Sequence, residues 1–220
     1  MSINTPYENA NDLPDTLPVF PLGGALLLPR GQLPLNIFEP RYLAMVDFAL
    51  KTNRLIGMVQ PLNDKKSAKP AIHQVGCAGR ITQLAETGDG RYVLTLTGVV
   101  RFQIIEELSV LTPFRQCQVQ FSGFVADLGE DAMESAVNRS GVIDALRQFA
   151  GVHKLQVDWE SINSASNEAL VNALSMMAPF NIKEKQALLE ATDLSHRAEV
   201  LIAISQMESA KSNGAPSRLQ

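Results

Sequence analysis

The spacing of apolar residues changes part of the way along the chain. Up to about Phe121, apolar residues come in short runs interrupted by proline and glycine, a pattern typical of strands joined by turns. After Gly123 they recur every three or four residues, which is typical of amphipathic helices. The sequence therefore predicts an α+β protein in which a sheet-rich part precedes a carboxy-terminal α-helical subdomain, with the division near residues 122–130.

Residues 17–42 (LPVFPLGGALLLPRGQLPLNIFEPRY) are apolar yet repeatedly interrupted. Proline fixes φ and removes a donor, and glycine permits unusual backbone conformations, so a long helix is excluded. Short strands are expected at residues 26–28 and 33–38. A helix is expected over residues 40–51, because proline is well tolerated in a first helical turn, and Asn53 is predicted to end it in the left-handed conformation.

Several more short strands are predicted, and they favour a barrel-like sheet. They are expected at residues 55–60, 75–85, 91–97, 101–108 and 115–121. Residues 87–90 (TGDG) predict a hairpin turn between two of them. Gly98 predicts a bulge or the close approach of another backbone segment. Short strands around one main helix favour a barrel-like arrangement, since closure hides exposed strand edges.

The second part of the chain predicts helices at residues 130–150, 166–178, 181–191 and 193–207. Ser166 and Asp193 are expected to cap two of them, and Asn181 and Glu184 have the spacing of a capping box. The expected domains are a flexible amino terminus (1–15), a β domain (16–125), a helical subdomain (126–208) and a disordered tail (209–220).

Four segments in a fixed order resemble a known family. They are residues 17–42, 75–81 (VGCAGRI), 96–102 (LTGVVRF) and 178–190 (APFNIKEKQALLE). Together they resemble the Lon protease amino-terminal domain family, in particular the small bacterial proteins that carry this domain alone. The resemblance implies a PUA-like β domain, a helical region after it, and a role in peptide or protein recognition.

The motifs needed for catalysis or metal binding are missing from the sequence. A phosphate loop needs glycines followed by lysine, and the dipeptide Gly-Lys does not occur. The resemblance places the serine–lysine protease module of Lon in a separate downstream domain, which the 220 residues do not include. His73 and Cys77 lie four residues apart in a predicted strand, and His153 and His196 are isolated, so no metal site or cofactor is expected. An unrecognised hydrolase remains an alternative, because triads assemble in space.

Composition narrows the possible partners and location. The net charge of −4 disfavours nucleic acid, which normally needs a basic face. Cys77 and Cys117 are expected to be buried, reduced thiols. The first 15 residues lack an apolar signal core, and no apolar run approaches the roughly 20 residues that span a bilayer, so a cytoplasmic location and no membrane contact are expected.

The loop at residues 61–70 is locally basic because it contains Lys65, Lys66 and Lys69. It is either a solvated loop or a contact for an acidic partner.

The sequence leaves two classes of function open. The first is a non-catalytic module that binds unfolded or partly folded polypeptide, or another protein, in a groove between sheet and helices. The second is a PUA-like domain that binds a small molecule or RNA. For the first, the expected binding residues are Phe20, Leu27, Leu35, Phe38, Glu39, Arg41 and Tyr42. Glu39 and Arg41 are also candidates for a structural pairing with a strand residue such as Arg101 or Glu106.

Overall fold

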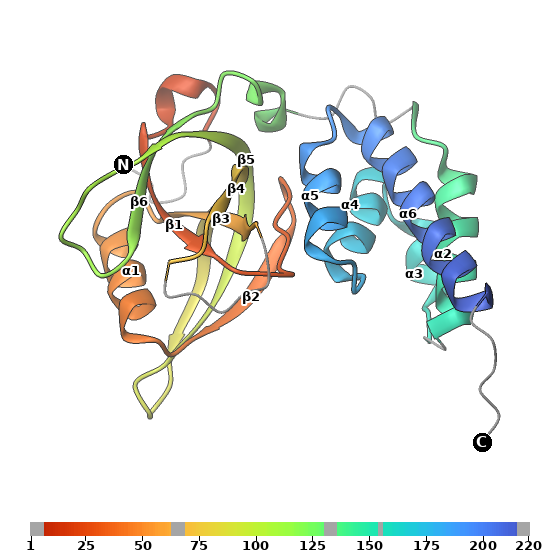
Figure 1. The fold of residues 1–220 in the computed structure, drawn as a ribbon, viewed down its shortest axis with the longest axis horizontal. Coiled ribbons are helices and arrows are strands. Elements are labelled where there is room, and N and C mark those ends of the chain that lie inside the picture. The colour runs from red at the N-terminus through yellow and green to blue at the C-terminus, as the bar shows by residue number, and fades with distance from the viewer. Residues whose placement is uncertain (1–6, 63–68, 130–135, 154–155, 215–220) are drawn as a thin grey trace. The chain divides into compact units, whose positions relative to one another are not determined.

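The protein divides into two compact units. The computed structural model describes residues 7–62, 69–129, 136–153 and 156–214. The first unit, here called the sheet unit, comprises Met1–Glu130 together with Pro179–Leu189. The second, the helical unit, comprises Asp131–Ala178 and Glu190–Gln220. Figure 1 shows the strands in the first unit and most of the helices in the second.

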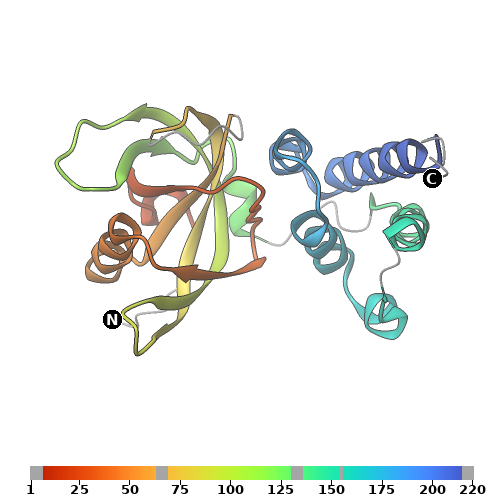
Figure 2. The same cartoon turned by 60° about the horizontal axis from the view of Figure 1, so that its bottom comes forward.

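The sheet unit is built on one curled, mixed sheet. Its elements are η1 (Ala10–Asp12), β1 (Thr16–Pro21), β2 (Gln32–Ile37), α1 (Pro40–Lys51), β3 (Leu55–Pro61), β4 (Ile72–Glu86), β5 (Tyr92–Glu107), β6 (Arg115–Gln120), η2 (Val125–Leu128) and α5 (Ile182–Glu190). The strand order is β2-β5-β4-β3-β1-β6, and β6 also pairs with β5, so the sheet curls round on itself (Figure 2). Strands β1 and β3 run parallel, and the other pairs are antiparallel. The predicted α+β class is confirmed.

The predicted β4–β5 hairpin and the close approach at Gly98 are both confirmed. The register between β4 and β5 shifts at Gly79, which pairs with Gly98. Gly98 N–H donates to the Gly31 carbonyl at 2.8 Å, and Arg30 N–H donates to the Gly98 carbonyl at 2.8 Å. A Cβ added at Gly98 would lie 2.0 Å from the Leu28 carbonyl oxygen. Only glycine therefore fits where this connection crosses β5.

Two local predictions in the first part are wrong. Residues 26–28 form no strand; Leu27 and its two neighbours instead bury their side chains in a connection. The reason is that the connection bonds to β5 through residues 30 and 31, outside a regular ladder. The left-handed residue after α1 is Arg54, with φ of 60°, and not Asn53. The Asn53 side-chain oxygen instead accepts a bond from Leu55 N–H at 3.0 Å.

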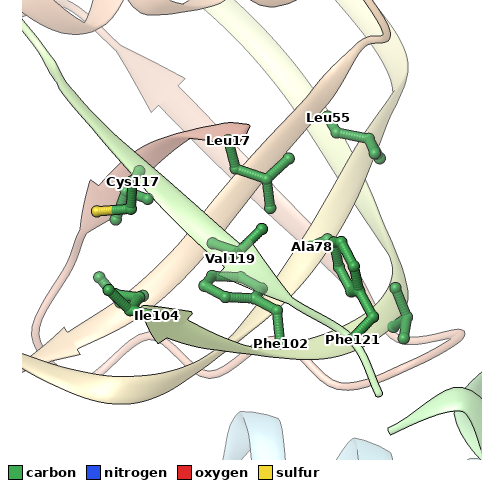
Figure 3. Close-up of a cluster of buried hydrophobic side chains, with 11 residues drawn as sticks. Leu17, Leu55, Ala78, Phe102, Ile104, Cys117, Val119 and Phe121 are labelled. Carbon is green, nitrogen blue, oxygen red and sulfur yellow. The ribbon is translucent and has the colours of Figure 1, made fainter. Parts of the chain in front are cut away.

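The core of the sheet unit is apolar and contains both cysteines. Figure 3 shows buried side chains converging, among them Leu17, Phe102 and Phe121. The Phe102 and Phe121 rings lie edge to face, with their centroids 6.4 Å apart. Cys117 belongs to this cluster and is fully buried. Cys77 is also buried, and neither cysteine forms a disulfide, as expected.

The Cys117 thiol should make stability fall in alkali. Burial, followed by the charge of Glu107, raises the pKa of Cys117 from 9.0 to about 11. Between these two values the unfolded chain releases a proton that the folded chain retains, so the free energy of unfolding falls as pH rises, by on the order of 2 kcal/mol. Denaturant titrations below pH 9 and near pH 11 should show this loss, and Cys117→Ala should reduce it. Cys77→Ala is the control and should lose stability with pH as the unaltered chain does. If stability falls just as steeply with pH in Cys117→Ala, the loss comes from other groups.

The helical unit contains α2 (Arg139–His153), α3 (Trp159–Ser164), α4 (Asn167–Met177) and α6 (Leu194–Gly214). Two predicted caps are confirmed: Ser166 Oγ accepts from Ala169 N–H at 3.1 Å, and Asp193 accepts from His196 N–H at 2.9 Å. Helix α6 continues to Gly214, beyond the predicted end at residue 207 and into the segment 209–220 that was expected to be a disordered tail. The expected helix at 130–150 begins at Arg139 among the described residues; residues 130–135 lie outside them.

Helix α5 packs on the sheet, although the sequence assigned it to the helical subdomain. Its predicted capping box is present: Glu184 N–H donates to Asn181 at 3.1 Å, and Asn181 N–H donates to Glu184 at 2.9 Å. Lys185 Nζ donates to the Gly24 carbonyl at 2.6 Å, and Gln186 Nε2 donates to the Val75 carbonyl at 3.2 Å. These two side chains bond α5 to the sheet unit, which explains why Pro179–Leu189 groups with it.

Candidate functional site

A cavity of about 650 Å³ opens in the sheet unit. Its lining comes from the end of β1, from β2, from the start of α1 and from the connection between β5 and β6 at residues 107–115. Six of the predicted binding residues line it, namely Phe20, Leu35, Phe38, Glu39, Arg41 and Tyr42. The proline-rich sequence at 17–42 positions them because it turns sharply between short strands before α1 begins at Pro40.

Leu27 is the predicted site residue that the structure places elsewhere. Its side chain is only 2% exposed, and a Cβ added at Gly79 would lie 2.6 Å from its Cδ2 atom. Leu27 thus packs against the sheet as part of the core. Leu35 lines the cavity but is itself buried at 9% exposure. A charged residue at either position would therefore disturb folding before it tested binding.

The apolar surface of the cavity runs from buried aromatic rings to exposed ones. The rings of Phe20 and Tyr42 lie with their centroids 4.2 Å apart, and Phe20 is buried. Phe38 follows β2 and is 61% exposed. Tyr42 is half-buried, so an exposed phenylalanine that lines the same cavity as this aromatic pair leaves apolar area open to a partner.

The 107–115 connection supplies the part of the site that sequence reasoning missed. Val110 lines the cavity and is 39% exposed, while the adjacent Leu111 is fully exposed. Phe114 is buried and packs its ring 5.4 Å from that of Phe48 on α1, which anchors the end of the connection. One sequence pattern could have revealed these residues: Val110 and Leu111 are two consecutive apolar residues in a segment without strand or helix periodicity.

Glu39 and Arg41 bind each other, and Arg101, one of the strand residues suggested as a partner, pairs with Asp127 instead. Arg41 Nε and Nη2 donate to one Glu39 carboxylate oxygen at 3.0 and 2.8 Å. Glu39 is the residue before α1 and has an extended backbone, which allows its side chain to reach back to Arg41. The Arg41 guanidinium also lies 4.6 Å from the centre of the Tyr42 ring.

A second group of charged side chains in the lining consists of Glu107 at the end of β5, Arg115 at the start of β6, and Lys69. Glu107 accepts from Lys69 Nζ at 2.8 Å and lies 3.6 Å from Arg115 Nε. Arg115 Nη2 donates to the Pro70 carbonyl at 2.6 Å. Its Nη1 atom is buried and has no hydrogen-bond partner among the described residues. One donor of this guanidinium is thus left unsatisfied.

The Tyr42 hydroxyl remains protonated at neutral pH. Burial raises the pKa of Tyr42 above its usual value of 10.0, the charges of Arg41 and Arg115 act against this rise, and Glu39 adds to it. Both guanidinium groups therefore lie close enough to influence the Tyr42 hydroxyl. The cavity combines apolar area, cationic side chains and a hydroxyl that can donate a hydrogen bond.

The described residues contain no group of three or more histidine, cysteine, aspartate or glutamate side chains placed to hold a metal ion. His73 and Cys77 both lie on β4, and the buried His73 Nε2 has no hydrogen-bond partner in the part of the chain that the structure describes. Within the same described ranges, no helix has the length and apolar character needed to cross a bilayer. Lys65 and Lys66 of the predicted basic loop lie outside them.

The chain resembles Lon proteins both in its sequence and in its fold. The fold is similar to that of the Lon N-terminal domain protein from Xanthomonas campestris, with a TM-score of 0.59, 22% identity and coverage of 86% of this chain and 97% of that one. The amino-terminal domain of the Mycobacterium avium complex Lon protease gives a TM-score of 0.62 at 18% identity, covering 87% and 98%. At these identities the two likenesses concern the fold.

The family model for the ATP-dependent protease La (LON) substrate-binding domain matches residues 16–206. The chain belongs to this family. Its curated relatives include the Lon protease of Flavobacterium johnsoniae, 27% identical over 86% of this chain, and Lon protease 2 of Myxococcus xanthus, 27% identical over 89%. The chain spans about 24% of the length of these two relatives.

Proposed function

We propose that this chain is a recognition module that binds exposed apolar segments of unfolded or partly folded polypeptides in the cavity of the sheet unit. The observation that carries the proposal is that one cavity is lined by the buried Phe20 ring, the half-buried Tyr42 ring against it and the exposed Phe38 and Val110 side chains, with the exposed Leu111 next to Val110 in the chain. Exposed apolar patches beside a concave site commonly mark protein contacts. Membership in a substrate-binding domain family supports the same proposal.

Recognition, and not catalysis, is the proposed role of the chain. The matched family model describes a substrate-binding domain, and the sequence lacks the Gly-Lys dipeptide of a phosphate loop. The net charge of −4 favours a polypeptide over RNA as the ligand. A cytoplasmic location remains a prediction from the sequence.

Charged substitutions at the exposed rim should weaken binding of unfolded polypeptide and leave folding intact. Phe38→Asp and Leu111→Asp each place a carboxylate on apolar contact area, and we expect about five- to tenfold weaker binding of fluorescently labelled, unfolded casein. Both side chains are largely exposed, so the free energy of unfolding should change by only about 0.5 kcal/mol. Fluorescence anisotropy and denaturant titration measure the two quantities.

Met177→Asp is the matched control for these variants. Met177 ends α4 in the helical unit and is 83% exposed, so the substitution adds the same charge on an equally open apolar side chain. It should bind casein as the unaltered chain does. If Met177→Asp weakens binding and the two rim variants do not, the binding surface lies on the helical unit.

Purified protein incubated with ATP and unfolded casein should show no turnover of either. An activity that stays with the protein through purification and disappears on a point substitution would favour the alternative of an unrecognised hydrolase.

A further inference from the structure

The guanidinium of Arg115 is held firmly in the cavity wall but is incompletely bonded. Nη2 donates to the Pro70 carbonyl at 2.6 Å, and Nε lies 3.6 Å from the Glu107 carboxylate. The side chain is only 13% exposed, so water has little access to it. Among the described residues that line the cavity, Arg115 alone carries a buried nitrogen with no hydrogen-bond partner, at Nη1. A ligand with a suitable acceptor would satisfy this donor.

The charges of the cavity favour a ligand with one negative charge. Its charged lining consists of three cationic side chains, Arg41, Lys69 and Arg115, and two carboxylates, Glu39 and Glu107. Glu39 pairs with Arg41, while Glu107 lies between Lys69 and Arg115. Among the described side chains of the lining, positive charges thus outnumber negative ones by one, and a single carboxylate would add a charge-assisted hydrogen bond. The two glutamates would repel a ligand with several negative charges.

The apolar walls restrict the source of that carboxylate. Phe20, Tyr42 and Val110 line the same cavity as Arg115, and the Tyr42 ring is close enough for the Arg115 charge to affect its hydroxyl. An aspartate or glutamate brings a carboxylate but no apolar side chain. The last residue of a polypeptide can bring both, because its α-carboxylate and an apolar side chain are attached to the same Cα. A chain end also needs only one entrance to the cavity.

We propose that the cavity binds the carboxy-terminal end of a polypeptide, with the free α-carboxylate on Arg115 Nη1 and an apolar last side chain against Phe20 and Tyr42. This inference rests on the proposed function and adds that the site selects polypeptides by their free α-carboxylate. Capture of a terminal carboxylate by a fixed donor is an established way for proteins to recognise peptides. Arg115 is then the residue that determines specificity within a general apolar site.

The test compares two short peptides of the same apolar sequence, labelled at the amino terminus, one ending in a free acid and one in an amide. Anisotropy titrations with the unaltered chain should show the acid binding about tenfold or more tightly, since a hydrogen bond to a charged group is lost in the amide. In Arg115→Met the two peptides should bind alike. Arg147→Met, which removes an exposed arginine of α2 outside the cavity, should keep the difference.

The outcomes separate this inference from the proposed function. Equal binding of acid and amide by the unaltered chain overturns selection of the chain end while leaving apolar recognition intact. Failure of both peptides and of unfolded casein to bind overturns both proposals. A third peptide, amidated and ending in aspartate, should bind as weakly as the amide. If it matches the free acid, the site takes a side-chain carboxylate and the chain-end proposal is wrong. The comparison of peptides on the unaltered chain does not depend on whether Arg115→Met folds.

Discussion

Asp127→Asn should lower the free energy of unfolding by about 3–5 kcal/mol, the range found when one partner of a buried ion pair is removed. Asp127 on η2 accepts from Arg101 Nε at 2.8 Å, from Nη2 at 2.8 Å and from the Arg101 backbone N–H at 2.9 Å. The Arg101 and Asp127 side chains are 4% and 9% exposed. Asparagine keeps the shape of the side chain but removes the negative charge that Asp127 holds against the Arg101 cation in a site that is almost closed to water.

The same arginine joins three parts of the sheet unit. Arg101 lies on β5, its partner on η2, and its Nη1 donates to the Leu189 carbonyl on α5 at 3.1 Å. Its guanidinium also lies 4.8 Å from the centre of the Phe124 ring. The loss of the ion pair should therefore loosen η2 and α5 together. Hydrogen exchange should show earlier opening of both elements in Asp127→Asn.

An exposed ion pair provides the control for this prediction. Asp144 and Arg147 are joined at 3.0 Å on α2, with side chains 64% and 59% exposed. Asp144→Asn should change stability by about 0.5 kcal/mol or less, because solvent screens the pair. The double variant Arg101→Met with Asp127→Leu should recover much of the loss. A small effect of Asp127→Asn, similar to that of Asp144→Asn, would contradict a structural role for the buried pair.

Gly98→Ala should destabilise the protein by about 3 kcal/mol or more, at the upper end for inserting a methyl group into a packed site. The added Cβ would lie 2.0 Å from the Leu28 carbonyl oxygen and 2.7 Å from its carbon. Both are backbone atoms, so no side-chain rotation relieves the contact. Relief requires the 28–31 connection to move away from β5 and to stretch the bonds that Gly98 exchanges with Arg30 and Gly31.

Gly88→Ala is the matched control, since a Cβ there meets no atom within 4 Å. It changes the same residue type in the turn between β4 and β5 and should alter stability by about 0.5 kcal/mol. Denaturant titrations of the two variants measure the difference. Equal stability of Gly98→Ala and Gly88→Ala would show that the connection can move at little cost.

Local features of the fold could be predicted from the sequence because they depend on neighbouring residues. The caps at Ser166, Asp193 and Asn181 and the start of α1 at Pro40 all follow from residue types within one turn of a helix. Strand β6 was predicted from its strict alternation. Features that join distant segments could not be predicted in this way.

The buried pair between Arg101 and Asp127 shows why. The two residues lie 26 positions apart, and nothing in either local pattern marks them as partners. Helix α5 was placed in the helical subdomain for the same reason, since its amphipathic pattern does not reveal which unit it packs on. The bond from Lys185 to Gly24 joins residues 161 positions apart.

The candidate site was predicted in part. The signature segment supplied six residues that line one cavity, because they are close in sequence and turn sharply between short elements. Leu27 was misassigned, since periodicity in an interrupted segment does not separate core from surface. Leu111 was missed, because its exposure depends on the path of the connection between β5 and β6. Arg115 was missed as well, because its unsatisfied donor is visible only in three dimensions.

The most direct test of binding in the cavity is to record the backbone amide resonances of the isotope-labelled chain while unfolded casein is added. The proposal predicts that the largest chemical-shift changes cluster at residues 35–42 and 107–115, which line the cavity of the sheet unit. Changes confined to α2, α4 and α6, or saturating casein without any change around the cavity, would contradict it.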